Sequence, residues 1–238
     1  MKQSGQLVSI VVPTYNEREN VALLYDGICR SLQPLWEFEL IFVDDDSPDG
    51  TAQAVRQLAE QDPRVRLLGR SGKLGLGSAV RDGFSVARGD YWVMMDADLS
   101  HQPRYLPDLL RALAGAEIAV GSRYVPGGGV ENWPMFRRLA SRVASWSGRV
   151  LVGLRVHDLT SGFAAFRRST LEPLLPGLRP RGFKLLLEVL AKTKGATVAE
   201  VPIIFVDRRY GRSKFASGEV VTYLRLCWDL RRERRQGR

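Results

Sequence analysis

Short apolar runs alternate with helix-like segments along the first 122 residues, and this order limits the possible folds more than any other feature. Leu7–Val12 forms an apolar run, as expected of a strand that is buried on both faces of a sheet. The following segment, Asn20–Leu32, places Val21, Leu24 and Ile28 on one stripe of a helix. Repetition of this unit predicts an α/β fold, with a doubly wound, mostly parallel sheet that carries helices on both faces.

The same patterns predict the remaining elements. Further strands are expected at Glu39–Val43, Val65–Leu68, Tyr91–Met95 and Ala116–Val120. Further helices are expected over Thr51–Glu60, Gly77–Arg88 and Pro103–Leu113. Later segments are less regular: Arg137–Val152 and Gly182–Lys194 look helical, Thr197–Val206 looks extended, and Gly127-Gly128-Gly129 indicates a mobile loop. We expect one domain over residues 1–217, followed by a basic amphipathic helix and tail over 218–238.

Carboxylates follow two of the predicted strands. Asp44, Asp45 and Asp46 come directly after one strand, and Asp96 and Asp98 come directly after another. Ligands of open α/β sheets bind along the carboxyl edge, where these acids are expected. Mg²⁺ and Mn²⁺ prefer oxygen ligands and are often shared with substrate phosphates. The acids therefore predict a metal-dependent enzyme that acts on a nucleotide diphosphate, although acids in turns are also common at solvated surfaces.

Composition and targeting signals restrict the class of protein further. The chain has 238 residues, of which 45% are hydrophobic, enough for a real core. Cys29 and Cys227 lie on apolar helical stretches, which is typical of reduced thiols. No signal-peptide core and no apolar run of about 18 residues is present. We therefore expect a cytoplasmic protein. The spacing of Gly72, Gly75 and Gly77 does not match a dinucleotide-binding fingerprint, which argues against a redox enzyme.

The formal net charge of +9 points to an anionic partner. Basic residues gather late in the chain, and nucleic acid, anionic lipid and phosphorylated ligands are all possible partners of such a chain. Zinc-ligand spacing, RNP-type aromatic motifs and a helix-turn-helix pattern are absent from the sequence. Nucleic acid is therefore the less favoured partner.

Seven ordered segments are similar to those of family 2 glycosyltransferases, and in particular of polyprenol-phosphate (dolichyl-phosphate) mannose synthases. These segments are VVPTYNERENV, FVDDDSPDGT, GLGSAVRDGF, DYWVMMDADLSHQP, VGSRYVPGGGVENWP, DLTSGFAAFRRS and VPIIFVDRRYGRSKF. The resemblance runs from about residue 7 to residue 215. It implies a GT-A fold and inverting transfer of mannose from GDP-mannose to a polyprenyl monophosphate, with Mg²⁺ or Mn²⁺.

The resemblance also implies roles for individual residues. The donor's nucleoside side would involve Pro13, Tyr15, Glu17, Phe42, Asp44 and Asp45. Asp96, Ala97 and Asp98 would contact the diphosphate, with Asp96 and Asp98 as metal ligands. The acceptor phosphate would be held by Arg123, Arg137 and Ser141. Arg208 and Lys214 would close over the donor and, with Asp98 and Arg123, form the catalytic set. Two positions depart from the commoner pattern, with Arg212 in place of Glu and Ser100 in place of Gln.

These residue types suit the implied chemistry. A phosphate monoester has a second pKa near ~6, so at neutral pH it is largely dianionic and needs positioning more than a strong base. Arginines supply charge and fixed donors for that purpose. The chain has only two histidines, His101 and His157, and neither lies in a triad-like motif. Three alternatives remain: another donor such as UDP-glucose or another acceptor, a degenerate module that only binds nucleotide sugars, and a nucleic-acid-binding protein.

A lipid acceptor would also require contact with a membrane surface. The C-terminal stretch Gly218–Arg235 places Val220, Val221, Leu224 and Trp228 at roughly helical spacing, with five arginines at or beyond position 225. A basic amphipathic helix of this kind can lie in a membrane interface. It can equally pack on the domain. A peripheral membrane position, with or without a separate anchoring subunit, is therefore an expectation.

Overall fold

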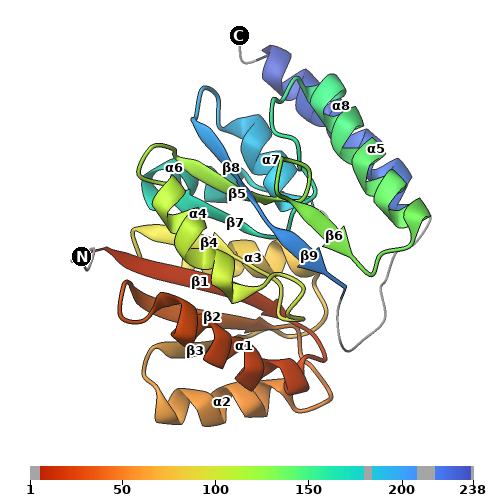
Figure 1. Cartoon of the computed structure of the whole chain (residues 1–238). Coiled ribbons are helices and arrows are strands. Elements are labelled where there is room, and N and C mark those ends of the chain that lie inside the picture. Colours follow the sequence, from red (N-terminus) through yellow and green to blue (C-terminus); the bar gives the residue numbers. More distant parts are fainter. Residues whose placement is uncertain (1–5, 180–183, 208–217, 237–238) are drawn as a thin grey trace.

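The computed structural model describes residues 6–179, 184–207 and 218–236 (Figure 1). Its main sheet has seven strands in the order β3-β2-β1-β4-β7-β5-β8. These strands are β1 (Leu7–Thr14), β2 (Glu37–Asp44), β3 (Val65–Gly69), β4 (Tyr91–Met94), β5 (Ile118–Ser122), β7 (Ala164–Arg167) and β8 (Val198–Pro202). Only β7 runs antiparallel to its neighbours, β4 and β5. A second, parallel sheet pairs β6 (Gly129–Glu131) with β9 (Ile204–Val206).

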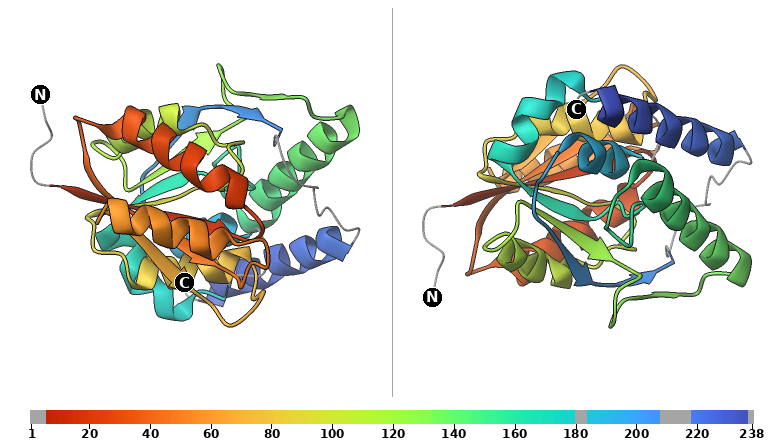
Figure 2. Two further views of the ribbon diagram at one scale, coloured as in Figure 1. Left: turned by 90° about the horizontal axis from the view of Figure 1, so that it is seen from below. Right: turned by 90° about the horizontal axis from the view of Figure 1, so that it is seen from above.

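Helices cover both faces of the main sheet (Figures 1 and 2). They are α1 (Arg18–Leu32), α2 (Thr51–Gln61), α3 (Leu76–Ser85), α4 (Leu106–Ala112), α5 (Met135–Val152), α6 (Arg168–Leu171), α7 (Leu185–Lys192) and α8 (Gly218–Gln236). Two 3₁₀ segments, η1 (Pro103–Tyr105) and η2 (Glu172–Gly177), precede α4 and follow α6. The predicted doubly wound, mostly parallel α/β sheet is confirmed.

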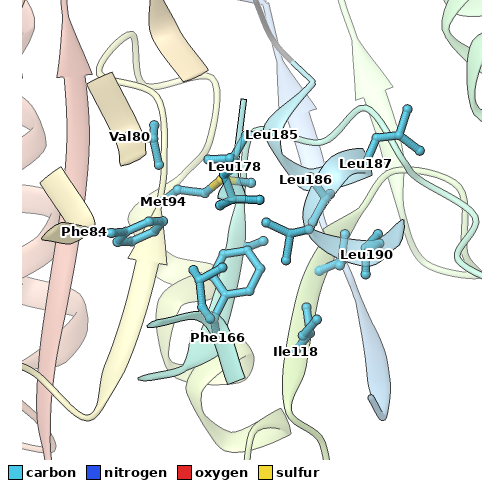
Figure 3. Close-up of a cluster of buried hydrophobic side chains, with 14 of the residues drawn as sticks. Val80, Phe84, Met94, Ile118, Phe166, Leu178, Leu185, Leu186, Leu187 and Leu190 are labelled. Atoms are coloured by element: carbon cyan, nitrogen blue, oxygen red, sulfur yellow. The ribbon is translucent and has the colours of Figure 1, made fainter. Parts of the chain in front are cut away.

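Alternation along β1 separates two hydrophobic clusters. Ile10 and Val12 pack in the cluster formed with α1 and α4, whereas Val11 packs in the cluster formed with α3 and α7. Figure 3 shows the second cluster, in which Phe84 of α3 lies near Met94 of β4, and Phe166 of β7 lies between them and the leucines of α7. Helix α3 can approach the sheet closely because Gly83 has no Cβ. A Cβ at this position would collide with the side chain of Val11. These two clusters fix the strand ends that carry the candidate site.

The structure adds to the sequence-based expectations at three places. The extended stretch Thr197–Val206 is split between two sheets, because β8 pairs with β5 and β9 pairs with β6. The glycine triplet expected to be a mobile loop is an ordered turn: the N–H of Gly128 donates to the carbonyl of Val125 at 2.9 Å, and Gly129 begins β6. Strand β7 was not predicted, and its antiparallel direction places residues 158–162 at the carboxyl edge of β4.

Helices α5 and α8 pack against each other and stand out from one end of the sheet (Figures 1 and 2). The hydroxyl of Tyr223 in α8 donates to the carbonyl of Ala144 in α5 at 2.7 Å. Cys227 and Leu230 are buried in the same core cluster as α7. The inner face of the C-terminal helix therefore belongs to the domain core. Among the described helices, none has both the length and the apolar composition that a membrane crossing requires.

Candidate active site

The carboxyl ends of β1 and β2 form the first part of the site. Asp44, the last residue of β2, is only 2% exposed. Its Oδ1 accepts hydrogen bonds from the hydroxyls of Thr14 (3.0 Å) and Ser47 (2.6 Å), and its Oδ2 accepts one from the Ser47 N–H (2.9 Å). A carboxylate has about four acceptor positions. Three bonds therefore fix its orientation and leave capacity for one ligand donor.

Asp45 ties a neighbouring loop to this edge. Its carboxylate makes a buried ion pair with Arg70 (2.7 Å) and accepts a hydrogen bond from the Gly75 N–H (3.0 Å). The loop between these residues carries Lys73, whose Nζ lies 4.2 Å from the centre of the Tyr15 ring. Both protein contacts of Asp45 support a role in holding this loop beside Tyr15.

Pro13, Glu17 and Phe42 were also expected on the donor side, and the structure buries them to different extents. Pro13 lines a small, mostly apolar pocket together with Asp96 and Gly162. Glu17 is half-buried and accepts a hydrogen bond from the Asn20 amide at 2.7 Å. Phe42 is fully buried among core residues of the first hydrophobic cluster. Its side chain is therefore not exposed at this edge, and a donor-binding role for Phe42 stays a prediction.

Asp96, Ala97 and Asp98 follow β4 in a tight turn. Leu99, the next residue, has φ of +61°, a left-handed conformation that is rare for a residue without a polar side chain. Asp98 is buried, and its Oδ1 accepts hydrogen bonds from the Ser100 N–H (3.1 Å) and hydroxyl (2.5 Å). Strain of this kind gathers at functional sites, where the surrounding structure imposes it.

His101 lies beside Asp96 and was not expected to belong to the site. Its Nδ1 is 3.3 Å from Oδ2 of Asp96 and 3.4 Å from the Asp96 backbone nitrogen. Its ring contacts those of Phe163 (5.3 Å) and Phe205 (5.1 Å between centres). Burial lowers the pKa of His101 to about 4, against the opposing field of Asp98. The imidazole is therefore neutral at neutral pH.

A glycine completes the surroundings of Asp96. A Cβ at Gly162 would lie 3.1 Å from Oδ2 of Asp96 and 3.1 Å from Cε1 of His101. Any side chain there would push against the carboxylate. The segment Ser161–Gly162 reaches this point because β7 runs antiparallel to β4.

The acidic pair fits a divalent cation that is shared with a substrate. Asp96 and Asp98 provide hard oxygen donors, and Mg²⁺ commonly binds to one or two carboxylates plus phosphate oxygens. In the described part of the chain, no three His, Cys, Asp or Glu side chains gather as a metal site. The two carboxylates would therefore hold the ion together with the donor diphosphate.

Arg123, at the end of β5, is engaged within the protein. Its Nε and Nη2 lie 2.7 Å from the two carboxylate oxygens of Asp158, and Nη2 also donates to the Thr160 hydroxyl at 2.8 Å. Burial alone would raise the pKa of Asp158, but the charge and hydrogen bonds of Arg123 hold that pKa below its usual value. The pair thus anchors the segment after α5 to the strand edge.

Arg137 and Ser141 occupy the first turns of α5, next to this pair. The hydroxyls of Ser141 and Thr160 are 3.3 Å apart, and Thr160 also contacts Arg123. The guanidinium of Arg137 lies 4.1 Å from the ring centre of Trp133 and 3.1 Å from a carboxylate oxygen of Asp207. Arg123, Arg137 and Ser141 are therefore gathered, as the sequence implied.

Two expected residues and several unexpected ones remain. Arg208 and Lys214 lie outside the described residues. Sequence reasoning missed His101, Asp158, Trp133 and Asp207, whose contacts join segments that are far apart in the chain. One sequence signal was available for Asp158, because a short polar run, DLTSG, precedes an apolar segment and indicates a strand edge.

Curated relatives resemble the chain over most of its length. A dolichol-phosphate mannosyltransferase of Pyrococcus furiosus is 45% identical over 226 residues, covering 94% of this chain and 63% of that protein. A polyprenol monophosphomannose synthase of Mycolicibacterium smegmatis is 42% identical over 223 residues, covering 90% of this chain and 83% of that protein. The chain thus spans less than two thirds of the Pyrococcus protein.

Solved structures share the fold. Glucosyl-3-phosphoglycerate synthase from Mycobacterium tuberculosis, in complex with Mn²⁺, UDP-glucose and glycerol 3-phosphate, aligns with a TM-score of 0.68 at 21% identity, covering 98% of this chain and 81% of that one. A mannosyltransferase from Pyrobaculum calidifontis, in complex with GDP-Man and Mn²⁺, aligns with a TM-score of 0.62 at 23% identity, covering 89% of this chain and 59% of that one. Residues 9–175 match the family model for glycosyl transferase family 2, and the chain belongs to that family.

Proposed function

We propose that the protein transfers mannose from GDP-mannose to a polyprenyl monophosphate with inversion, assisted by Mg²⁺ or Mn²⁺. The names of the two curated relatives, which are 45% and 42% identical, support mannose and a polyprenyl phosphate. The solved mannosyltransferase with GDP-Man and Mn²⁺ supports the nucleotide and the metal. The alternative is a related transferase that uses UDP-glucose or a different acceptor.

One observation carries the proposal: acids and arginines meet at the same sheet edge through a continuous set of ring contacts. His101, beside Asp96, contacts Phe205 at 5.1 Å, and Phe205 contacts Trp133 at 5.1 Å. Arg137 lies over Trp133. A donor diphosphate at the acids and an acceptor phosphate at the arginines would therefore be neighbours, as a direct displacement requires.

The chain's residues then have distinct tasks. Asp96 and Asp98 would hold a divalent ion, which would supply positive charge beside the diphosphate of the donor. Asp44 and Tyr15 orient the nucleoside side of the donor. Arg137 and Ser141 hold the acceptor phosphate, which is largely dianionic at neutral pH and attacks without a strong base. The low pKa of His101 fits this scheme, because a neutral imidazole positions Asp96 without adding charge.

A donor screen tests the proposal. The protein is incubated with Mn²⁺, a short-chain polyprenyl phosphate and, in separate reactions, GDP-mannose, GDP-glucose, UDP-glucose or UDP-N-acetylglucosamine. Mass spectrometry of the lipid fraction should show a hexosyl product with GDP-mannose. A product with UDP-glucose alone would establish the alternative, and no lipid product with any donor would reject transfer to polyprenyl phosphate.

We also propose a peripheral position at the cytoplasmic face of a membrane. Helix α5 exposes an apolar ridge along one face, formed by Met135, Phe136, Leu139, Val143, Trp146 and Val150, with exposures of 52–85%. Steps of three or four residues place these side chains on the same side of the helix. An unpartnered apolar face of this size indicates an interaction surface.

Two features favour a lipid surface as the occupant of the apolar ridge. The acceptor-side residues Arg137 and Ser141 belong to the same helix, on the face turned toward the domain, so a bilayer on the ridge would lie about one helix diameter, ~10 Å, from them. Exposed arginines, among them Arg138 and Arg142, flank the ridge and suit anionic headgroups. The free thiols of Cys29 and Cys227 fit a reducing compartment. An anchoring subunit that covers the ridge is the alternative occupant.

A further inference from the structure

Asp207 faces the arginine to which the proposed function assigns the acceptor phosphate. It follows β9 directly, and its two carboxylate oxygens lie 3.1 and 3.3 Å from Nη1 of Arg137. The two side chains are 30% and 19% exposed, so the pair is accessible from solvent. A carboxylate of the protein itself therefore occupies one anion position at this guanidinium.

The other side of Arg137 is closed by an aromatic ring. The guanidinium carbon lies 4.1 Å from the ring centre of Trp133, and that ring packs in turn against the ring of Phe205. The Nε of Arg138 donates to the backbone carbonyl of Trp133 at 3.1 Å. The buried Nε1 of Trp133 has no hydrogen-bond partner among the described residues. Arg137 is therefore held in place between a ring and a carboxylate.

We propose that Asp207 is the resident counter-ion of the acceptor site and exchanges with the acceptor phosphate during each catalytic cycle. This inference rests on the proposed function. An arriving phosphomonoester brings nearly two negative charges and displaces a carboxylate that carries one. Transfer of a sugar turns that monoester into a diester with a single negative charge. The product and the Asp207 carboxylate then carry one negative charge each. Asp207 therefore competes more effectively for Arg137 against the product than against the substrate, and the renewed ion pair favours release of the product.

The exchange and a purely orienting role of Asp207 predict opposite effects on binding when its carboxylate is removed. A competing carboxylate weakens substrate and product by the same factor, so removing it should tighten both. A carboxylate that only orients Arg137 would, when removed, weaken both. The expected factor is about fivefold, because the pair is partly exposed and screened by solvent.

The test uses two soluble probes that differ by one charge, geranyl phosphate and its methyl ester. Calorimetry of the full chain should show that Asp207→Asn tightens both about fivefold, while their affinity ratio is unchanged. Steady-state assays of the same variant should show a lower KM for a short-chain acceptor together with a lower kcat, because product leaves more slowly. Unchanged or weaker binding of the probes by Asp207→Asn would overturn the exchange.

Two further variants test the exchange at Asp207 separately from the proposed binding of the acceptor phosphate by Arg137. Asp108→Asn removes a carboxylate from another exposed arginine pair, with Arg111 in α4, and should leave both affinities unchanged. In the Arg137→Gln background, Asp207→Asn should have no further effect on binding. If Arg137→Gln binds both probes as well as the wild type, the acceptor assignment itself fails. If Arg137→Gln loses binding but Asp207→Asn does not tighten it, only the exchange fails.

Discussion

His101 is buried against Asp96, with its Nδ1 3.3 Å from the Oδ2 of that carboxylate. The ring is neutral at physiological pH, because burial lowers its pKa to about 4. A neutral partner can fix the carboxylate while leaving its full charge available to a cation. This contact could not be predicted from the local sequence, because His101 follows Asp96 in a loop whose shape depends on Leu99 and on packing from β7.

The buried imidazole predicts how stability depends on pH. An unfolded histidine titrates near 6.5, whereas His101 in the folded protein titrates at about 4. Below about pH 6.5 the unfolded state takes up a proton that the folded state refuses, so the free energy of unfolding should fall. By pH 5 the loss should be roughly 2 kcal/mol, and it should level off below about pH 4.

Urea unfolding of the chelated, metal-free protein between pH 7.5 and 5 would measure this slope. His101→Gln keeps an amide in place of the ring and should flatten the slope, even if the variant is less stable at every pH. His157→Gln is the matched control, because His157 is 47% exposed and pairs with Glu200 at the surface. An equal slope in wild type and His101→Gln would contradict the burial argument.

The metal site predicts the result of removing one carboxylate. Asp98→Ala deletes a hard oxygen ligand and leaves the diphosphate charge under-neutralised. Turnover should fall by ~10²-fold or more, comparable to the loss of one strong electrostatic contact at a reacting centre. The fold should survive, because Asp98 lies in the loop after β4 and its carboxylate bonds to the nearby Ser100 rather than packing in a hydrophobic cluster.

Titration of Mn²⁺ followed by electron paramagnetic resonance measures the same loss independently of activity. Asp98→Ala should weaken Mn²⁺ binding in the presence of GDP, whereas the surface control Asp108→Ala should not. Full activity of the wild type after exhaustive chelation would rule out a metal-dependent reaction.

Donor and acceptor contacts should separate by mutation. Asp44→Ala removes a carboxylate held by Thr14 and Ser47 on the donor side, so GDP binding should weaken. Arg137→Ala removes a cation on the acceptor side, so use of polyprenyl phosphate should weaken while GDP binding stays close to that of the wild type. Calorimetric titration of GDP into both variants gives the comparison. Equal losses of GDP affinity would refute the division.

The apolar ridge predicts binding to anionic vesicles. Phe136→Ser combined with Trp146→Ser should reduce binding at least about tenfold, because each large apolar side chain contributes roughly 2 kcal/mol on burial. High salt should weaken the remaining binding by screening the arginines. Deleting residues 218–238 is a poorer test, because Tyr223, Cys227 and Leu230 of α8 belong to the core.

Co-sedimentation with phosphatidylglycerol vesicles gives the measurement. The control is Leu23→Ser, which removes an apolar side chain that is 46% exposed on α1, far from the ridge in sequence. If the ridge variant binds like the wild type, the ridge does not face the membrane. If the wild type itself does not bind, the ridge serves a protein partner instead.

Much of the fold could be predicted from local sequence. Parallel strands such as Leu7–Thr14 are apolar runs bounded by turn residues, so the local pattern reveals that they exist. Strand β7 could not be predicted in the same way, since four residues, Ala164–Arg167, carry no periodicity and direction is decided by the neighbours with which they pair. The second sheet was missed because β6 and β9 have three residues each.

The site shows the same limit. The acids at Asp44, Asp96 and Asp98 could be predicted, because strand-end acids form a local pattern. The partners of the arginines could not, since Asp158 is 35 positions from Arg123 and Asp207 is 70 positions from Arg137. Such pairs depend on tertiary packing, which one sequence without aligned relatives does not reveal.

The arrangement of the sheet edge has a consequence for how such enzymes can diverge. Asp44 and the Asp96–Asp98 pair come from the first hundred residues, at the end of β2 and just after β4. Arg123, Arg137 and Asp207 come from later segments and are added from the other side of β7. Under the proposed function, substitutions among these later residues can therefore change how the sugar acceptor is held while the acids after β2 and β4 stay in place.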